Sequence, residues 1–289
     1  MLVWRRVERM IYIISHGRPH NQKTYNLLRH CGYTGYIKVV VDNEDKTIIE
    51  YYKELEADKN VEVGVFNKQE MIDCTDTGLL EPMRNFAVFA RNAVEQDALS
   101  NGYDLFWVFD DDLTSFRLRY ADGDSLRSLK ITHSLDKVFK LMEEFVLNTN
   151  IATLGFGTAN NYMSGVKSIE KESSKYRMCY NGYLRNSVYP VEWSLNMCED
   201  RITSILQNKV GNIWMQLLCL QIDTMPLGGI VEGGNSDVYR NMDKFHQVFF
   251  PVVTSPDCNY TKVIKEKWYT MYNEKTMCPK IISSRYKEK

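Results

Sequence analysis

The sequence contains no long, uncharged apolar stretch, so it lacks the usual signature of a membrane-spanning helix. Its first segment, "MLVWRRVERMIYIISH", is charged where a secretory signal needs its apolar centre, and it has no small-residue cleavage site. We therefore expect no membrane partner and a cytoplasmic location. Met1 and Met10 are both candidate starts, because residues 1–9 precede the first predicted strand without an evident role.

Clustered or paired cysteines are also missing. The chain has seven cysteines, an odd number, and none stands in a C-x-x-C pair. Zinc sites and disulfide frameworks depend on closely spaced or paired cysteines, so the pattern argues against both. Scattered free cysteines are typical of a protein in a reducing compartment.

The chain has no excess of charge of either sign. It carries 36 basic and 37 acidic residues, a formal net charge of −1, so its composition gives no support for strong attraction to nucleic acid or anionic membrane. Its 289 residues are 44% hydrophobic and 25% charged, the balance of an ordinary globular protein. We see no repeat or linker, which favours one domain over residues 1–289.

Predicted strands and helices alternate through the first half. Short β-rich runs predict strands that end near Ser15, Asp42 and Asp112, and helical spacing of apolar residues predicts helices between them. This order is typical of a doubly wound α/β sheet, which binds ligands outside the carboxyl ends of its strands. The predicted segments are strands at 10–18, 35–46, 61–67, 105–112 and 151–158, and helices at 21–33, 51–59, 81–104 and 134–148.

The second half is less regular. Residues 167–185 hold five basic and two acidic residues and predict a loop, and residues 262–289 hold eight basic and three acidic residues. A helix is expected at 200–211, with one or two strands at 212–223. The glycine-dense segment 228–239 predicts either a loop that closes over a ligand or ordinary turns.

Three consecutive carboxylates end the apolar strand "LFWVF", and they raise the question of what offsets their charge. Asp110 and Asp112 share a side of an extended segment, whereas Asp111 points away. Two converging carboxylates suit a hard divalent cation such as Mn²⁺ or Mg²⁺. A solvated turn in which the aspartates bind local backbone groups is the alternative. The preceding basic helix favours the cation.

Several motifs resemble those of GT-A glycosyltransferases, which bind a nucleotide-sugar through an Asp-x-Asp motif and a metal. The segments "IYIISHGRPHNQKTYNLL", "IKVVVDNED", "RNFAVFARN" and "WVFDDDLTSFRLR" together resemble the TET-associated glycosyltransferases, found largely in bacteriophages. The resemblance is dense up to Arg119 and patchier beyond it. It implies a single Rossmann-like GT-A domain, with residues 1–120 as the nucleotide-sugar half and residues 121–289 as the acceptor half. If the chain is phage-encoded, its location is the host cytoplasm.

The resemblance also implies roles by position. It suggests a hexosyl- or pentosyltransferase that moves a sugar from a UDP-linked donor to a hydroxymethylated pyrimidine in double-stranded DNA. Asp112, Asp110 and His246 are the expected metal ligands, and His246 equally suits a packed or surface position. The expected donor-binding residues are Ser15, Arg18, Asp42, Arg84, Asn85, Arg91, Asp110 and Asp111.

Glu199 and Asp200, in "MCEDRITSILQ", open a predicted helix and are the candidates for catalysis. By analogy with GT-A enzymes, one of them would accept the proton of the acceptor hydroxyl, with Asp200 the first choice and Glu199 the second. Acidic residues are also common in the first helical turn, where they interact with free backbone N–H groups.

Basic residues are expected to meet DNA phosphates along one face. The candidates are Arg117, Arg119, Arg127, the 167–185 segment and the C-terminal tail, and a mixed-charge solvated surface is the alternative. The target base would have to leave the stack to reach the donor sugar. Tyr120, Tyr176, Tyr180 and Tyr183 are candidate stacking partners.

Three other functions remain open from the sequence. The acceptor can be a polysaccharide, protein or lipid instead of DNA, or the chain can be a non-catalytic binding module on the same fold. A sugar-nucleotide nucleotidyltransferase is disfavoured, because "SHGRPHNQK" has one glycine where those enzymes carry a glycine-rich phosphate loop. The sequence does not specify the donor sugar, the stereochemical outcome or the oligomeric state.

Overall fold

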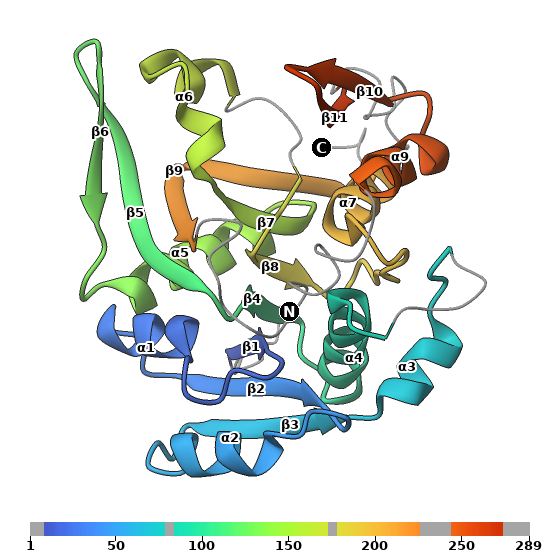
Figure 1. The fold of residues 1–289 in the computed structure, drawn as a ribbon. Helices are drawn as coiled ribbons and strands as arrows, with labels where there is room; N and C mark the ends of the chain where they lie inside the picture. Colours follow the sequence, from blue (N-terminus) through green and yellow to red (C-terminus); the bar gives the residue numbers. More distant parts are fainter. Residues whose placement is uncertain (1–8, 79–83, 173–177, 226–243, 274–289) are drawn as a thin grey trace, which may run out of the picture.

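A nine-stranded mixed sheet forms the centre of the molecule, with the strand order β3-β2-β1-β4-β8-β7-β9-β5-β6 (Figure 1). The computed structural model describes residues 9–78, 84–172, 178–225 and 244–273. The strands of the sheet are β1 (Met10–Ile14), β2 (Tyr36–Asp42), β3 (Val61–Phe66), β4 (Leu105–Asp110), β5 (Leu113–Asp122), β6 (Ser125–Lys130), β7 (Ile151–Gly157), β8 (Gly182–Asn186) and β9 (Ile213–Thr224).

The sheet has a parallel part and an antiparallel part. Strands β3, β2, β1 and β4 pair in parallel, as the alternation of predicted strands and helices indicates. β8 then runs antiparallel to both β4 and β7, while β9 is parallel to β7 and antiparallel to β5. The sheet therefore continues across residue 120, where the two predicted halves meet.

Helices cover both faces of the sheet, and a separate hairpin lies beside the last helix (Figure 1). That hairpin consists of β10 (Asn259–Ile264) and β11 (Lys267–Tyr272). The helices are α1 (Lys23–His30), α2 (Ile48–Leu55), α3 (Lys68–Cys74), α4 (Ala87–Ser100), α5 (Leu135–Leu147), α6 (Val166–Glu172), α7 (Glu199–Lys209) and α9 (Lys244–Thr254), with a short 3-10 helix at Ala159–Tyr162.

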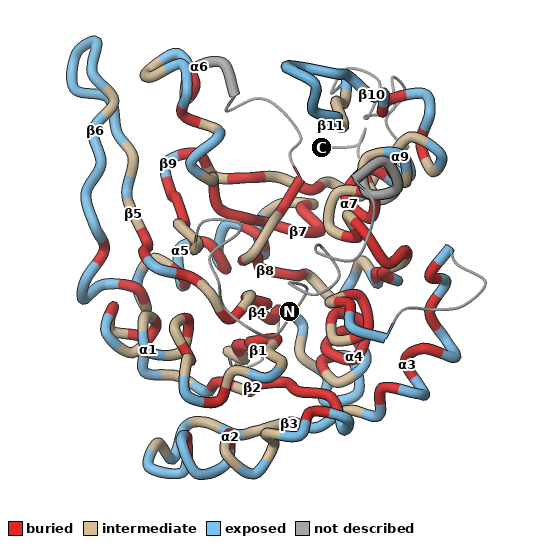
Figure 2. Tube along the Cα trace, in the orientation of Figure 1, coloured by how far each residue is buried: buried red, intermediate tan, exposed pale blue. Residues whose placement is uncertain are grey.

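Two apolar layers pack against the sheet, one on each face. Much of the central part of the sheet is buried (Figure 2). The layer beneath α1, α2 and α5 contains stacked aromatic rings, with Trp107 and Phe139 centroids 4.3 Å apart. The layer beneath α3 and α4 includes Phe89, Trp193 and Trp214. Strand β4 is buried from Leu105 to Phe109, so the acidic triplet stands at the carboxyl end of the most buried strand of the parallel part.

The structure corrects several predicted elements. The helix expected from residue 81 begins at Ala87, so Arg84 and Asn85 precede it. The segment 167–185, expected as a loop, contains most of α6 and most of the central strand β8. The one or two strands expected at 212–223 are one long strand, Ile213–Thr224, and the β5–β6 hairpin was not predicted. No helix within the described ranges is both long and apolar enough to cross a membrane.

Candidate active site

The carboxyl ends of β1, β2 and β4 meet at one edge of the parallel part of the sheet. Ile14 of β1 pairs with Val40 of β2 and with Asp110 of β4. Ser15 follows β1 directly, and its backbone N–H donates to the Val40 carbonyl at 3.0 Å. The polar residues that end these strands therefore gather where open α/β sheets bind ligands.

The middle carboxylate of the acidic triplet is turned into the protein. Asp111 is 6% exposed, and it accepts hydrogen bonds from Ser15 Oγ at 2.6 Å and from Arg18 at 2.7 Å. Ser15 and Arg18, which the sequence predicts to bind the donor, therefore form hydrogen bonds with Asp111, another predicted donor-binding residue. Asp110 and Asp112 are more exposed than Asp111, in agreement with the alternation expected from the sequence.

Asp110 and Asp112 form the candidate cation site. Burial and the charges of Asp110 and Asp111 raise the pKa of Asp112 to about 7. Within the described part of the chain, no side chain forms an ion pair or hydrogen bond with the Asp112 carboxylate. The Asp112 carboxylate, beside the negative charge of Asp110, fits a hard divalent ion such as Mn²⁺ or Mg²⁺.

The remaining ligands of such an ion are not supplied by the described side chains. Among residues 9–78, 84–172, 178–225 and 244–273, no group of three or more His, Cys, Asp or Glu residues is arranged to hold a metal. The side chain of His246, near the start of α9, lies outside the described residues, as does the glycine-dense segment 228–239. Phosphate oxygens and water would complete the coordination, as is usual for Mg²⁺.

Arg91 joins the acidic triplet to the second acidic motif. It lies in α4, is 3% exposed, and donates to Asp110 at 3.1 Å and to Glu199 at 3.2 Å. Its third partner is the Tyr183 hydroxyl of β8, at 2.7 Å. Two motifs 89 residues apart in the sequence, at Asp110 and Glu199, thus share one buried guanidinium.

Glu199 and Asp200 open α7, as the sequence predicts. Burial raises the pKa of both carboxyls, and for Glu199 the neighbouring Asp200 charge adds to the effect. Cys198 before them has a φ of 56°, in the left-handed region that few non-glycine residues adopt. Glu199 is bound to Arg91, whereas Asp200 Oδ1 accepts a hydrogen bond from the backbone N–H of Arg201 at 2.6 Å.

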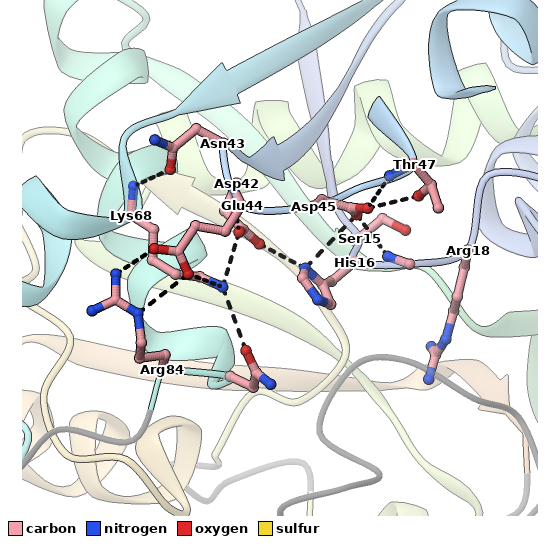
Figure 3. A network of polar contacts seen from close by, with 12 residues as sticks. Ser15, His16, Arg18, Asp42, Asn43, Glu44, Asp45, Thr47, Lys68 and Arg84 are labelled. Atoms are coloured by element: carbon pink, nitrogen blue, oxygen red, sulfur yellow. Dashed lines mark hydrogen bonds and ion pairs between the residues drawn. The ribbon is translucent and has the colours of Figure 1, made fainter. Parts of the chain in front are cut away.

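Asp42, at the end of β2, lies in a network of ionic contacts (Figure 3). Its carboxylate contacts His16 Nδ1 at 2.7 Å and Lys68 Nζ at 2.9 Å. Burial works to raise the pKa of Asp42, but the hydrogen bonds from His16 and Lys68 outweigh it and lower the pKa to about 2. Asp42 is therefore ionised and held in one position at neutral pH.

Arg84 approaches the same network from the segment before α4 (Figure 3), and Asn85 contacts it from the same segment. Arg84 forms an ion pair with Glu44, which follows β2. Asn85 Oδ1 accepts from Lys68 Nζ at 3.5 Å. The structure thus gathers the predicted donor-binding residues in two neighbouring networks, one around Asp42 and one around Asp110 and Asp111.

Several residues of these networks were not predicted, among them His16, Lys68 and Tyr183. His16 and Lys68 lie two residues after the ends of β1 and β3, so the strand-end rule that selected Asp42 would also have selected them. Tyr183 was noted only as a stacking aromatic, but it is fully buried and contacts Arg91. Nothing in its local sequence indicates this role, because it depends on the antiparallel pairing of β8 with β4.

The α/β sheet, with its parallel 3-2-1-4 part continued by antiparallel strands, has the GT-A type of fold. The chain belongs to the TET-associated glycosyltransferase family, whose sequence model matches residues 9–228. A search of curated proteins found no match.

Solved structures with a similar fold share little sequence with the chain. They include S. aureus TarS 1–349, with 10% identity, a TM-score of 0.46, and coverage of 86% of this chain and 65% of that chain. The complex of TarS 1–349 with UDP has 10% identity, a TM-score of 0.43, and coverage of 86% and 70%. The galactosyltransferase LgtC, in complex with donor and acceptor sugar analogs, has 10% identity, a TM-score of 0.35, and coverage of 62% and 58%. The chain therefore spans just under two thirds of TarS 1–349.

Proposed function

We propose that this protein transfers a sugar from a nucleotide-sugar, with UDP as the expected carrier, to a hydroxymethylated pyrimidine in DNA. The observation that carries the proposal is the buried Arg91 bridge, which brings Asp110 and the Glu199–Asp200 pair to one site. A donor-phosphate site and a candidate base then lie side by side. Membership of the TET-associated family supports modified DNA as the acceptor.

Asp110 and Asp112 would hold Mn²⁺ or Mg²⁺. When bound, the ion neutralises the donor diphosphate and stabilises the charge that builds on it as it departs. The protein's own groups would then position the donor: Asp42 would accept hydrogen bonds from the nucleoside, and Arg84 and Asn85 lie in the same network of polar contacts. Arg91 keeps the Asp110 carboxylate in place from within the protein.

The acceptor hydroxyl would attack the anomeric carbon of the sugar. A new carbon–oxygen bond forms, the bond to the diphosphate breaks, and the nucleoside diphosphate leaves with the bonding electrons. The hydroxyl proton passes to a carboxylate of the second motif. Burial raises the pKa of both carboxyls, which makes each a stronger proton acceptor, and Asp200 is the better candidate because Glu199 is already bound to Arg91.

A transfer assay tests the proposal directly. The protein is incubated with Mn²⁺, a panel of UDP- and GDP-sugars, and duplexes that contain cytosine, 5-hydroxymethylcytosine or 5-hydroxymethyluracil. The digested nucleosides are then analysed by mass spectrometry. We expect an added hexose or pentose on a hydroxymethylated base, and its loss when EDTA is present.

Matched aspartate variants test the site. Loss of an outer-shell partner of a metal typically costs about 10–100-fold in metal affinity or activity. Asp112→Asn removes a direct ligand and should therefore lower transfer by more than this. Asp104→Asn, at an exposed residue just before the opposite end of β4, removes the same charge and should leave transfer unchanged. Release of UDP without any mass added to DNA would move the acceptor to another molecule. Neither transfer nor release would instead favour a binding module.

A further inference from the structure

The β5–β6 hairpin has two chemically different faces, and its strand pairing assigns each side chain to one of them. Residues directly opposite in an antiparallel pair share a face. Arg117 is opposite Lys130, and Arg119 is opposite Ser128. These four residues form what we call the basic face. The hairpin extends beyond the rest of the sheet, and much of it is exposed (Figures 1 and 2).

Two of the three cations on the basic face have no acidic partner among the described residues. Arg117 forms an ion pair with Asp223 of β9 at 2.6 Å, and its charge is offset there. Arg119 donates from Nε to Gln221 at 2.5 Å and lies over the Tyr162 ring, 4.8 Å from its centroid. Both partners are neutral, so neither of them offsets the positive charge of the Arg119 guanidinium. Lys130 is exposed and forms no ion pair in the described part of the chain.

The opposite face is apolar and carries the third arginine of the hairpin. It contains Leu118 and Leu129, which are opposite each other, and Tyr120, which is opposite Arg127. Arg127 forms an ion pair with Asp122 on the same face at 3.2 Å. The sequence led us to expect all three hairpin arginines on one face, and this expectation was wrong. The register separates Arg127 from Arg117 and Arg119.

Strand β5, which carries Arg117 and Arg119 of the basic face, begins at the candidate active site. β5 starts at Leu113, immediately after Asp112. At about 3.4 Å per residue, Arg117 and Arg119 lie about 17 and 24 Å along the strand from Asp112. Successive phosphates of one DNA strand advance by about 3.4 Å along the helix axis, so these distances correspond to about five to seven base pairs. Asp122, the last residue of β5, and Asp124, in the turn that follows, place negative charge at the far end of the hairpin.

We infer that the basic face of the β5–β6 hairpin binds the phosphate backbone of the acceptor duplex, about five to seven base pairs from the target base. The inference rests on the proposed DNA acceptor. Uncompensated cations on an extended strand match the regular negative charge of a duplex, and the strand leads directly into the site that holds the donor. Arg119 and Lys130 make the contacts, and Arg127 does not take part.

The experiment compares two exposed cations of one hairpin. Lys130→Gln removes one positive charge from the basic face, and Arg127→Gln removes one from the apolar face. Affinity for a 30-base-pair duplex with one central 5-hydroxymethylcytosine is measured by fluorescence anisotropy over a series of salt concentrations. Each lost phosphate contact should reduce the slope of log K against log [salt] by about 0.9. We expect this reduction in Lys130→Gln and an unchanged slope in Arg127→Gln.

Kinetics with the same variants, and with Arg119→Gln, give a second measurement. Lys130→Gln and Arg119→Gln should raise KM for DNA, while kcat and KM for the donor stay at the wild-type values. Suppose that the wild type modifies the duplex. If Lys130→Gln then has the wild-type slope of log K against log [salt], or if Arg127→Gln reduces this slope as much as Lys130→Gln does, the role of the hairpin is wrong. The proposed function stands in either case. If the wild type neither binds nor modifies the duplex, the DNA acceptor is wrong, and the role of the hairpin is wrong with it.

Discussion

A single side chain, Arg91, is expected to affect both stability and activity. It is buried and offsets two carboxylates that belong to different motifs, Asp110 and Glu199. Arg91→Gln would leave these carboxylates without a cation, and breaking a buried ion pair in this way costs about 3–5 kcal/mol. Urea unfolding should show this loss as a lower midpoint, and sugar transfer should fall with it.

Arg91→Lys separates the charge of the arginine from its shape. A lysine keeps the positive charge, but it lacks the planar guanidinium with which Arg91 reaches Asp110, Glu199 and Tyr183 at once. We expect intermediate stability and poor transfer in this variant. A wild-type urea midpoint in Arg91→Gln would show that the bridge is not a stabilising contact.

The His16–Asp42 contact makes part of the stability dependent on pH. The hydrogen bond to Asp42 raises the pKa of His16 above its usual 6.5. The stabilisation from this contact is fully present at pH values below the pKa that His16 has in the unfolded chain. It is lost as the pH rises through the pKa that His16 has in the folded protein. Asp42, with its pKa of about 2, stays ionised throughout this range. The difference in unfolding free energy between wild type and His16→Gln should therefore be larger at pH 5.5 than at pH 9. An equal difference at both pH values would contradict this assignment.

Strand β8 places a glycine where its neighbours leave no space for a side chain. A Cβ added at Gly182 would lie 2.6 Å from the Phe109 ring and 3.1 Å from Ile222. Phe109 is fully buried and precedes Asp110, so Gly182→Ala should cost about 1–3 kcal/mol as overpacking and should also lower transfer. Gly64→Ala in β3 is the matched control, because its close neighbour is the flexible Lys38 side chain. Equal urea midpoints for the two variants would contradict this account.

The parallel strands could be predicted from the sequence, but β8 could not. Apolar runs and the polar residues that end them located β1, β2 and β4, and with them Asp42 and the acidic triplet. β8 lies in a basic segment, and its buried Arg185 is compensated by a distant residue, Glu95 of α4, at 2.7 Å. Local patterns do not contain such a partner. The Arg91 bridge was missed for the same reason, since it depends on long-range packing of α4 against β4 and α7.

The continuity of the sheet bears on the single-domain prediction. Strands from both predicted halves lie side by side, since β4 pairs with β8 and β5 pairs with β9. The apolar layer beneath α5 likewise combines residues from Ile11 to Ile222. Trp107 in the first half donates a hydrogen bond to Glu143 in the second, at 2.8 Å. Separate unfolding of residues 1–120 would expose these shared surfaces.

We therefore expect the protein to unfold in one cooperative transition. Far-ultraviolet ellipticity reports on the helices and strands of both halves, and tryptophan fluorescence reports on Trp107, Trp193 and Trp214 in the two apolar layers. The two signals should give the same urea midpoint, as a two-state transition requires. Gly182→Ala, at the boundary between the parallel and antiparallel parts, should lower both midpoints equally. A fluorescence change that precedes the loss of ellipticity would instead reveal two units that unfold independently.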